Sequence, residues 1–122
     1  NTMFRRRLCG HAPFQIFYAF ENYTQAIKYD PKMVDAYYNR AHVILMFENL
    51  DERGLKQALS DLREAINLDG KFLDALYYSA VVKMKLKDYK GAVEDLDRVI
   101  EIEPQAIHSK ALKKLILQKY MK

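Results

Sequence analysis

The chain has 122 residues, half of them apolar and 30% charged, with only four glycines and three prolines. Its longest uninterrupted apolar run, residues 43–47, is far shorter than the roughly 20 residues of a membrane-spanning helix, so we expect no membrane span. The chain opens Asn-Thr-Met with no apolar stretch after it, which argues against a signal peptide and suggests a fragment or processed product. The single cysteine, Cys9, fits a reducing compartment and a cytoplasmic location.

The net charge of +4 is unevenly distributed along the chain. Residues 107–122 carry five lysines and no acidic residue, whereas residues 34–72 and 73–106 each hold seven acidic and five basic residues. A nucleic-acid-binding protein is expected to concentrate Lys and Arg on one working face. The pattern therefore disfavours nucleic-acid binding, which remains a third alternative that would use the basic ends.

Three segments share one pattern and end in an acid followed by a helix breaker: residues 22–31 (NYTQAIKYDP), 61–70 (DLREAINLDG) and 95–104 (DLDRVIEIEP). In each segment a large apolar residue is followed three positions later by a small or β-branched residue, and then by isoleucine. That spacing is helical. The intervals of 39 and 34 residues between the segments indicate an internal repeat.

A second helical segment precedes the last two of these segments, since residues 33–45 align with residues 72–84 at the same 39-residue interval. Each repeat is therefore predicted to contain a helix, a turn, a second helix and a breaker. In chain order, we expect helices near residues 14–29, 33–48, 53–68, 73–86, 89–102 and 105–120.

This layout, with its period of 34, resembles the tetratricopeptide repeat. The last copy matches the family pattern at Leu76, Ser79, Ala80, Asp88, Tyr89, Ala92, Leu96, Val99 and Pro104, and the middle copy matches it at Tyr37, Arg40, Ala41, Ile44, Ala58, Leu62 and Ala65. The resemblance implies an all-α fold, a right-handed α-solenoid of antiparallel helix pairs. The small residues should let paired helices approach closely, while the large ones fill the space between them.

The repeats divide the chain into three regions. Residues 1–13 are expected to be irregular or frayed, because Gly10 and Pro13 fall where a helix is wanted. The repeats occupy residues 14–106: a partial copy at 14–33, a copy at 34–72 with a five-residue insertion within residues 47–57, and a copy at 73–106. Residues 107–122 are predicted to form an amphipathic C-terminal capping helix, which terminal repeats need. A basic helix for a membrane surface is the alternative.

The chain contains no HExxH, CxxC, glycine-rich phosphate loop or GxSxG motif, and its histidines, His11, His42 and His108, lie in unrelated segments. Acidic residues such as Asp95 are expected to be solvated on the outer helix, and Lys83, in place of a usual tyrosine, to be exposed or poorly packed. The sequence therefore predicts no catalytic residue, no metal site and no cofactor.

The resemblance implies that the first helices of the repeats line a concave groove that binds peptides. The candidate partner-binding residues on these helices are Asp35, Tyr38, Asn39, His42 and Met46, followed by Asp74, Tyr77, Tyr78, Val81 and Lys85. Tyrosines offer contact area with a polar tip, and the flanking acids would favour a basic ligand. The alternative, left open for each tyrosine, is packing against a neighbouring helix.

The leading hypothesis is a non-catalytic interaction module, an adaptor or scaffold that binds a partner peptide or stacks within a longer array. The runner-up is a co-chaperone that captures acidic C-terminal tails through the family's carboxylate clamp. Asn39 fits that clamp, but Asp74 and Tyr78 stand where the resemblance requires Lys and Arg. The clamp residues of the first repeat fall on Phe4 and Leu8, which do not match either.

Overall fold

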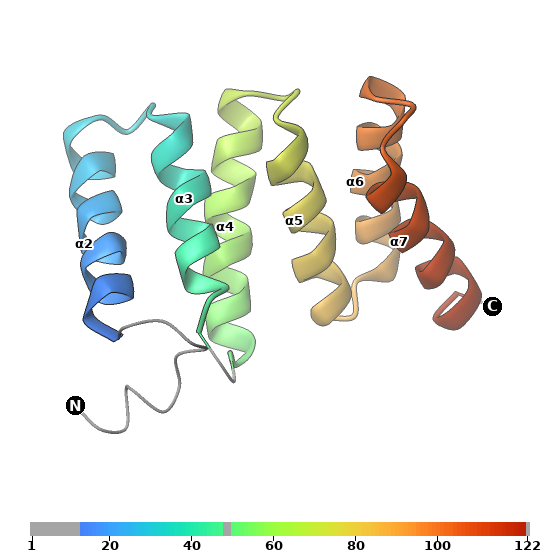
Figure 1. Cartoon of the computed structure of the whole chain (residues 1–122), viewed down its shortest axis with the longest axis horizontal. Coiled ribbons are helices and arrows are strands. Elements are labelled where there is room, and N and C mark those ends of the chain that lie inside the picture. Colours follow the sequence, from blue (N-terminus) through green and yellow to red (C-terminus); the bar gives the residue numbers. More distant parts are fainter. Residues whose placement is uncertain (1–12, 48–49, 122) are drawn as a thin grey trace.

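The computed structural model describes residues 13–47 and 50–121. They form α2 (Pro13–Tyr29), α3 (Val34–Ile44), α4 (Glu52–Leu68), α5 (Leu73–Lys85), α6 (Tyr89–Ile102) and α7 (Ile107–Lys119). Figure 1 shows these helices stacked in chain order, from α2 at one end of the molecule to α6 and α7 at the other. Each helix packs on the next one in the chain. The predicted all-α solenoid of helix pairs is confirmed.

Five of the six predicted helices begin and end within two residues of the observed bounds. Pro13 is the first residue of α2, a position where the missing amide hydrogen costs nothing. The rest of the segment expected to be irregular, residues 1–12, lies outside the described residues. Asp51 and Asp88 cap α4 and α6, because their carboxylates accept hydrogen bonds from the amides of Gly54 and Gly91.

The prediction that the second of these helices continues to residue 48 is wrong. α3 ends at Ile44, and the amides of Met46 and Phe47 bond back to the carbonyls of Val43 and Ile44, which tightens the last turn. The tighter turn lets Met46 and Phe47 pack against a small cluster around Ile16 and Val43. Residues 48–49 lie outside the described part of the chain.

The five-residue excess of the middle repeat is taken up by both a longer connection and a longer helix. α4 has 17 residues where α6 has 14, while α3 has 11 residues where α5 has 13. Residues 45–51 connect α3 to α4, whereas residues 86–88 suffice between α5 and α6. The insertion therefore lies in the turn between α3 and α4 and in α4 itself.

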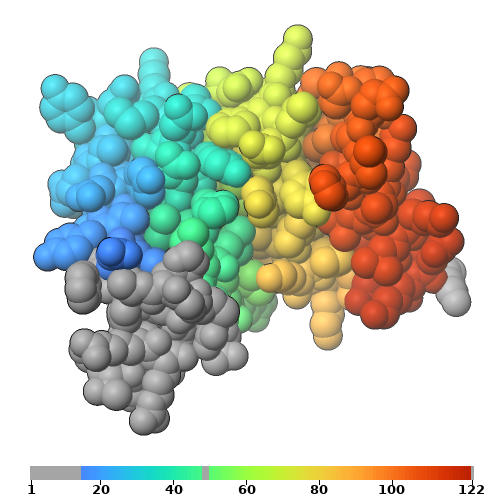
Figure 2. Space-filling view, in the orientation of Figure 1, coloured from blue at the N-terminus to red at the C-terminus, as the bar shows by residue number. Residues whose placement is uncertain are grey.

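Alanines stand where the paired helices approach each other. Ala41, Ala58, Ala80 and Ala92 are all fully buried, as expected. Leu62, Leu76 and Leu96 fill the space between the pairs and are 0–1% exposed. Tyr37 is half-buried against this core, and its hydroxyl donates a hydrogen bond to the carbonyl of Pro31 at 2.9 Å. Side chains fill the spaces between neighbouring helices on the face shown in Figure 2.

Polar contacts also join the two helices of each repeat. Arg40 of α3 holds Asp61 of α4 with two hydrogen bonds, Nε to Oδ2 at 2.8 Å and Nη2 to Oδ1 at 2.7 Å. In the last repeat, Asp95 of α6 accepts a hydrogen bond from the Ser79 hydroxyl at 2.7 Å and pairs with Lys83 Nζ at 2.9 Å. The middle and last repeats therefore each carry a buried carboxylate that their own first helix neutralises.

The last repeat overturns two expectations about its charged residues. Asp95 is buried rather than solvated, at 8% exposed. Lys83 is not exposed, because its side chain retains 15% of its accessible area. The two findings have one cause: Asp95 adjoins Leu96 on the packed face of α6, and a carboxylate there is stable only when a cation and a hydroxyl compensate it.

Candidate functional site

The predicted partner-binding residues lie on α3 and α5 and in the turn after α3. Asp35, Asp74 and Lys85 are exposed, whereas the other seven are half-buried: Tyr38, Asn39, His42, Met46, Tyr77, Tyr78 and Val81. The predicted residues on α3 and those on α5 lie on helices that both pack against α4, which comes between them in the chain. Aromatic contacts then connect them directly.

Five rings form what we call the aromatic ridge: Tyr38, His42, Phe72, Tyr77 and Tyr78. The Tyr38 ring lies 4.8 Å from that of Phe72 and 6.2 Å from that of Tyr78, between ring centroids. Tyr78 in turn meets His42 at 5.8 Å and Tyr77 at 5.5 Å, both edge to face. All four centroid distances lie in the range that aromatic pairs prefer, and the two edge-to-face pairs also have a preferred orientation. Sequence patterns did not identify Phe72, the residue before α5, as part of this contact.

The tyrosines of the ridge pack against neighbours and remain partly open as well. Tyr38 and Tyr78 rest on the core of the middle repeat, and Tyr77 rests on the core between α5, α6 and α7. None of the three is fully buried. Packing therefore fixes the rings in place without removing them from the surface.

The environment of Tyr38 disfavours ionisation of its phenol. Burial, then the negative charge of Asp74, then the neighbouring Tyr78 together raise the pKa of Tyr38 to about 12 from an ordinary 10.0. The phenol is therefore neutral at physiological pH and remains a hydrogen-bond donor at the surface of the ridge. Because the charge of Asp74 affects the pKa of Tyr38, the Asp74 carboxylate lies near the ridge.

A hollow of about 700 Å³ lies on one side of the ridge, between α5 and α7. Asp74, Tyr77 and Tyr78 line it from α5, and Ile107 and His108 line it from the first turn of α7. Ile107 is 75% exposed, an unusual value for an isoleucine. Sequence reasoning assigned α7 only a capping role, although a 34-residue step from Asp74 leads to His108 and could have revealed the contribution of this turn.

A smaller hollow of about 290 Å³ lies between α2 and α3. Asn39, His42 and Met46 line it together with residues of α2 such as Ala19 and Tyr23. Four other predicted residues line neither of these two hollows: Asp35, Tyr38, Val81 and Lys85. The predicted binding residues therefore surround two separate hollows, and the aromatic ridge lies between these hollows.

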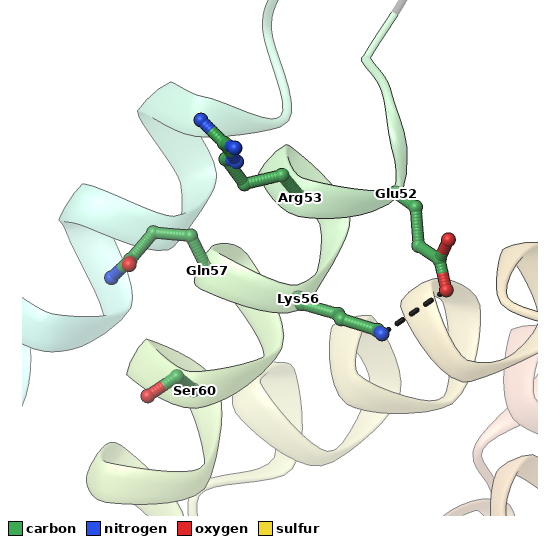
Figure 3. A pocket seen from close by; sticks show the side chains of 5 residues that line it. All are labelled: Glu52, Arg53, Lys56, Gln57 and Ser60. Carbon is green, nitrogen blue, oxygen red and sulfur yellow. Dashed lines mark ion pairs between the residues drawn. The ribbon is translucent and has the colours of Figure 1, made fainter.

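A third hollow, of about 430 Å³, lies on the exposed side of α4. All five side chains that line it, Glu52, Arg53, Lys56, Gln57 and Ser60, come from that one helix, as Figure 3 shows. Glu52 and Lys56 form an ion pair at 3.1 Å, but both side chains are about two-thirds exposed or more. Exposed pairs of this kind contribute little. This surface offers no convergent group, so it is not the candidate site.

Within residues 13–47 and 50–121, no group of three or more His, Cys, Asp or Glu side chains is arranged to hold a metal ion. In the same residues, no helix combines the length and the apolar character needed to cross a membrane.

Comparisons with known proteins agree with this architecture. Residues 73–122 match the family model of the Fis1 C-terminal tetratricopeptide repeat. A DnaJ protein P58IPK homolog B of Oryza sativa is 34% identical over 86 residues, which make up 70% of this chain but only 18% of that protein.

Two solved structures have similar folds. The first tetratricopeptide-repeat domain of Spaghetti (RPAP3), bound to an HSP90 peptide, superposes with a TM-score of 0.79 at 22% identity, covering 88% of this chain and 82% of that one. The Arabidopsis OM64 tetratricopeptide-repeat domain gives 0.75 at 28% identity, covering 86% and 83%. Repeat pattern, helix stacking and these similarities agree, and the chain has the fold of tetratricopeptide-repeat domains.

Proposed function

We propose that the chain is a protein–protein interaction module that holds a partner peptide along its first helices, α3 and α5. The aromatic ridge carries this proposal, because its rings are fixed by packing, half-exposed and flanked by a hollow on each side. The module has no catalytic role of its own in this proposal, and it works inside the cell, where the single cysteine would stay reduced.

The ridge suits an extended peptide because rings that are already ordered lose little entropy on binding. The rings of Tyr38 on α3 and Tyr78 on α5 lie 6.2 Å apart between centroids, so one peptide can touch both helices. Side chains of the peptide would enter the hollow between α5 and α7 on one side and the hollow between α2 and α3 on the other.

The charges around the ridge favour a basic and apolar peptide over an acidic one. Asp35 and Asp74 are both exposed at this surface, and Asp74 acts electrostatically on Tyr38. A carboxylate of the ligand would be repelled by Asp74, and the hydroxyl of Tyr78 cannot hold it in two places as a guanidinium would. RPAP3 binds an acidic HSP90 peptide on the same fold, but Asn39 alone is not enough for that ligand here.

The test begins with peptides selected from a random library by their binding to the chain. We expect the selected peptides to be rich in Lys, Arg and large apolar residues. Replacement of Tyr38 or Tyr77 by alanine should weaken their binding by about 1–2 kcal/mol, or about 5- to 30-fold in Kd. The matched control is Arg63→Ala on the exposed side of α4, which should change binding by less than about twofold. Normal binding by both tyrosine variants, with loss in Arg63→Ala, would move the site to the outer face.

The acidic peptide SRMEEVD, which is bound in the RPAP3 structure, tests the alternative function. We expect no saturable binding at concentrations on the order of tens of micromolar. Clear binding that disappears in Asn39→Ala would favour the carboxylate-clamp co-chaperone instead.

We also propose that residues 107–122 cap the stack after the repeats at 14–33, 34–72 and 73–106. α7 packs on α6 through Ile116, which is fully buried, while much of its remaining surface is exposed. The capping role is supported by Lys110, Lys113 and Lys114, which α7 places on the face where another helix would pack.

A further inference from the structure

The outer side of α7 forms a hollow that the proposed peptide groove does not use. It measures about 500 Å³ and lies between α6 and α7, lined by Ile100, Lys110, Lys113, Lys114, Leu117 and Gln118. Ile100 and Leu117 supply an apolar floor, and Leu117 is 41% exposed. Three lysines surround that floor.

The repeat explains which face of α7 this is. A step of 34 residues leads from Leu76, Ser79 and Ala80 of α5 to Lys110, Lys113 and Lys114 of α7. In α5 these three residues are buried, at 0–1% exposed. There they belong to the helix pair α5–α6, and Ser79 bonds directly to Asp95 of α6. The hollow is therefore the surface on which a second helix would pack if α7 were a first helix.

The lysines exclude a second helix of the usual kind. Ala41 and Ala80 let their partner helices approach closely, whereas Lys114 stands at the equivalent place in α7. A tightly packed apolar helix would force that ammonium group into a dry interface, which is costly unless the charge is paired. Any helix that covers this floor must therefore supply carboxylates.

Unpaired positive charge is available at the rim. Lys113 Nζ pairs with Asp97 Oδ1 of α6 at 2.6 Å. Among the described residues, no carboxylate lies within ion-pair distance of Lys110 or Lys114. These two lysines are one helical turn apart, so they face the same side of α7.

The chain already joins helices by this chemistry. Asp61 beside Leu62 meets Arg40, and Asp95 beside Leu96 meets Ser79 and Lys83. In both cases the first helix supplies the cation, and the second supplies an acid next to its core leucine. We propose that the hollow between α6 and α7 docks an acidic amphipathic helix of a partner protein, with leucines on Ile100 and Leu117 and carboxylates on Lys110 and Lys114.

The probe is a synthetic amphipathic peptide of about 16 residues, long enough to hold a helix, with a leucine stripe flanked by glutamates. Its control replaces every glutamate by glutamine. We expect saturable binding of the glutamate peptide that weakens as salt is raised, and binding of the glutamine peptide that is at least about tenfold weaker. Equal binding of the two peptides would overturn the proposal.

Charge reversal at the rim locates the site. The double variant Lys110→Glu/Lys114→Glu should weaken binding of the glutamate peptide by about tenfold or more. The matched control is Lys71→Glu, an exposed lysine in the turn between α4 and α5, which should have little effect. Melting curves of both variants establish that they remain folded. Unchanged binding in the double variant, or a loss as large in Lys71→Glu, would contradict the site.

A gain of binding gives the sharper result. Asp97→Asn removes the carboxylate that occupies Lys113, so the glutamate peptide should bind about 2- to 5-fold more tightly. An unchanged or weaker affinity would count against the proposal. Tyr77→Ala, which affects the groove between α5 and α7, should leave binding of this peptide unchanged, so the two proposed sites can fail separately. Binding of phosphatidylserine vesicles without binding of the glutamate peptide would show a membrane-surface helix and would overturn the proposal.

Discussion

The middle repeat and the last repeat neutralise a carboxylate at equivalent positions with different residues. In the middle repeat, the planar guanidinium of Arg40 grips Asp61 at two points and also reaches Thr24 of α2 at 3.4 Å, so it connects three helices. In the last repeat, the serine that replaces Arg40 is too short to do this alone. Lys83, one turn further along α5, supplies the charge, and Ser79 supplies only a hydrogen bond.

The two repeats therefore share a chemical requirement at this position, although the residue types that meet it differ. A carboxylate buried beside the core leucine must be compensated, and either one long cation or a hydroxyl with a lysine achieves this. The hydrogen bond with Asp61 raises the pKa of Arg40, against the opposing effect of burial. The two solutions should nevertheless differ in how much stability each cation contributes.

Breaking the arginine contact should have the largest effect. Arg40→Met removes the cation and leaves Asp61, at 3% exposed, with the weak contact to Gln57 at 3.5 Å as its one remaining side-chain hydrogen bond among the described residues. We expect a loss of about 3–5 kcal/mol in the free energy of unfolding, measured by urea denaturation. The double variant Arg40→Met/Asp61→Leu should recover most of it, because no unpaired charge remains. A double variant as unstable as the single one would show that apolar packing of Arg40, and not its charge, matters.

Removing the core leucines tests whether the two repeats are equivalent apart from their polar contacts. Leu62 and Leu96 occupy the same place and are 1% and 0% exposed. Each change to alanine should cost about 2–4 kcal/mol, with similar values in the two repeats. The same denaturation curves measure both. A melting temperature of Leu96→Ala within error of the parent chain would contradict its burial between the helices.

Removing the lysine should have a smaller effect than removing the arginine. In Lys83→Met the hydroxyl of Ser79 still donates to Asp95, whose side chain is 12% exposed and can gain some water. The expected loss is about 1–2 kcal/mol. A double-mutant cycle with Ser79→Ala would measure the coupling of the two donors. A loss in Lys83→Met equal to that in Arg40→Met would erase the distinction between the repeats.

The smallest effect concerns the contact between the middle repeat and the last repeat, where Tyr38 of the middle repeat lies near Asp74 and Tyr78 of the last repeat. Because its pKa is raised to about 12 from 10.0, the folded chain keeps this proton at pH values where the unfolded chain has lost it. The stability that Tyr38 contributes is complete below pH 10 and falls as the pH rises towards 12. The difference in tyrosinate absorbance between the parent chain and Tyr38→Phe should show this titration.

Asp74→Asn is the control for this titration. It should lower the pKa of Tyr38 only partway, because burial is the larger cause. A return to 10 in that variant would show that the carboxylate, and not burial, is dominant.

Local patterns were enough to predict most of the fold. Helix positions, the breakers between them and the alanines at close approaches depend on residue types spaced along one helix, so the chain itself carries that information. α3 is an exception, because the packing of Met46 and Phe47 on Ile16 and Val43 ends it early. The candidate groove on α3 and α5 was predicted from the family resemblance, and the helical spacing then indicated which residues share its face.

The remaining features depend on residues that meet only when the helices stack. Asp95 looked like a surface acid because its partners, Ser79 and Lys83, belong to another helix. Phe72, Ile107 and His108 joined the groove because stacking placed the starts of α5 and α7 beside the ridge. Residue types along the chain were sufficient to indicate the helices and their apolar faces. The burial of charges and the lining of the hollows could not be inferred in this way, because those properties arise from contacts between helices.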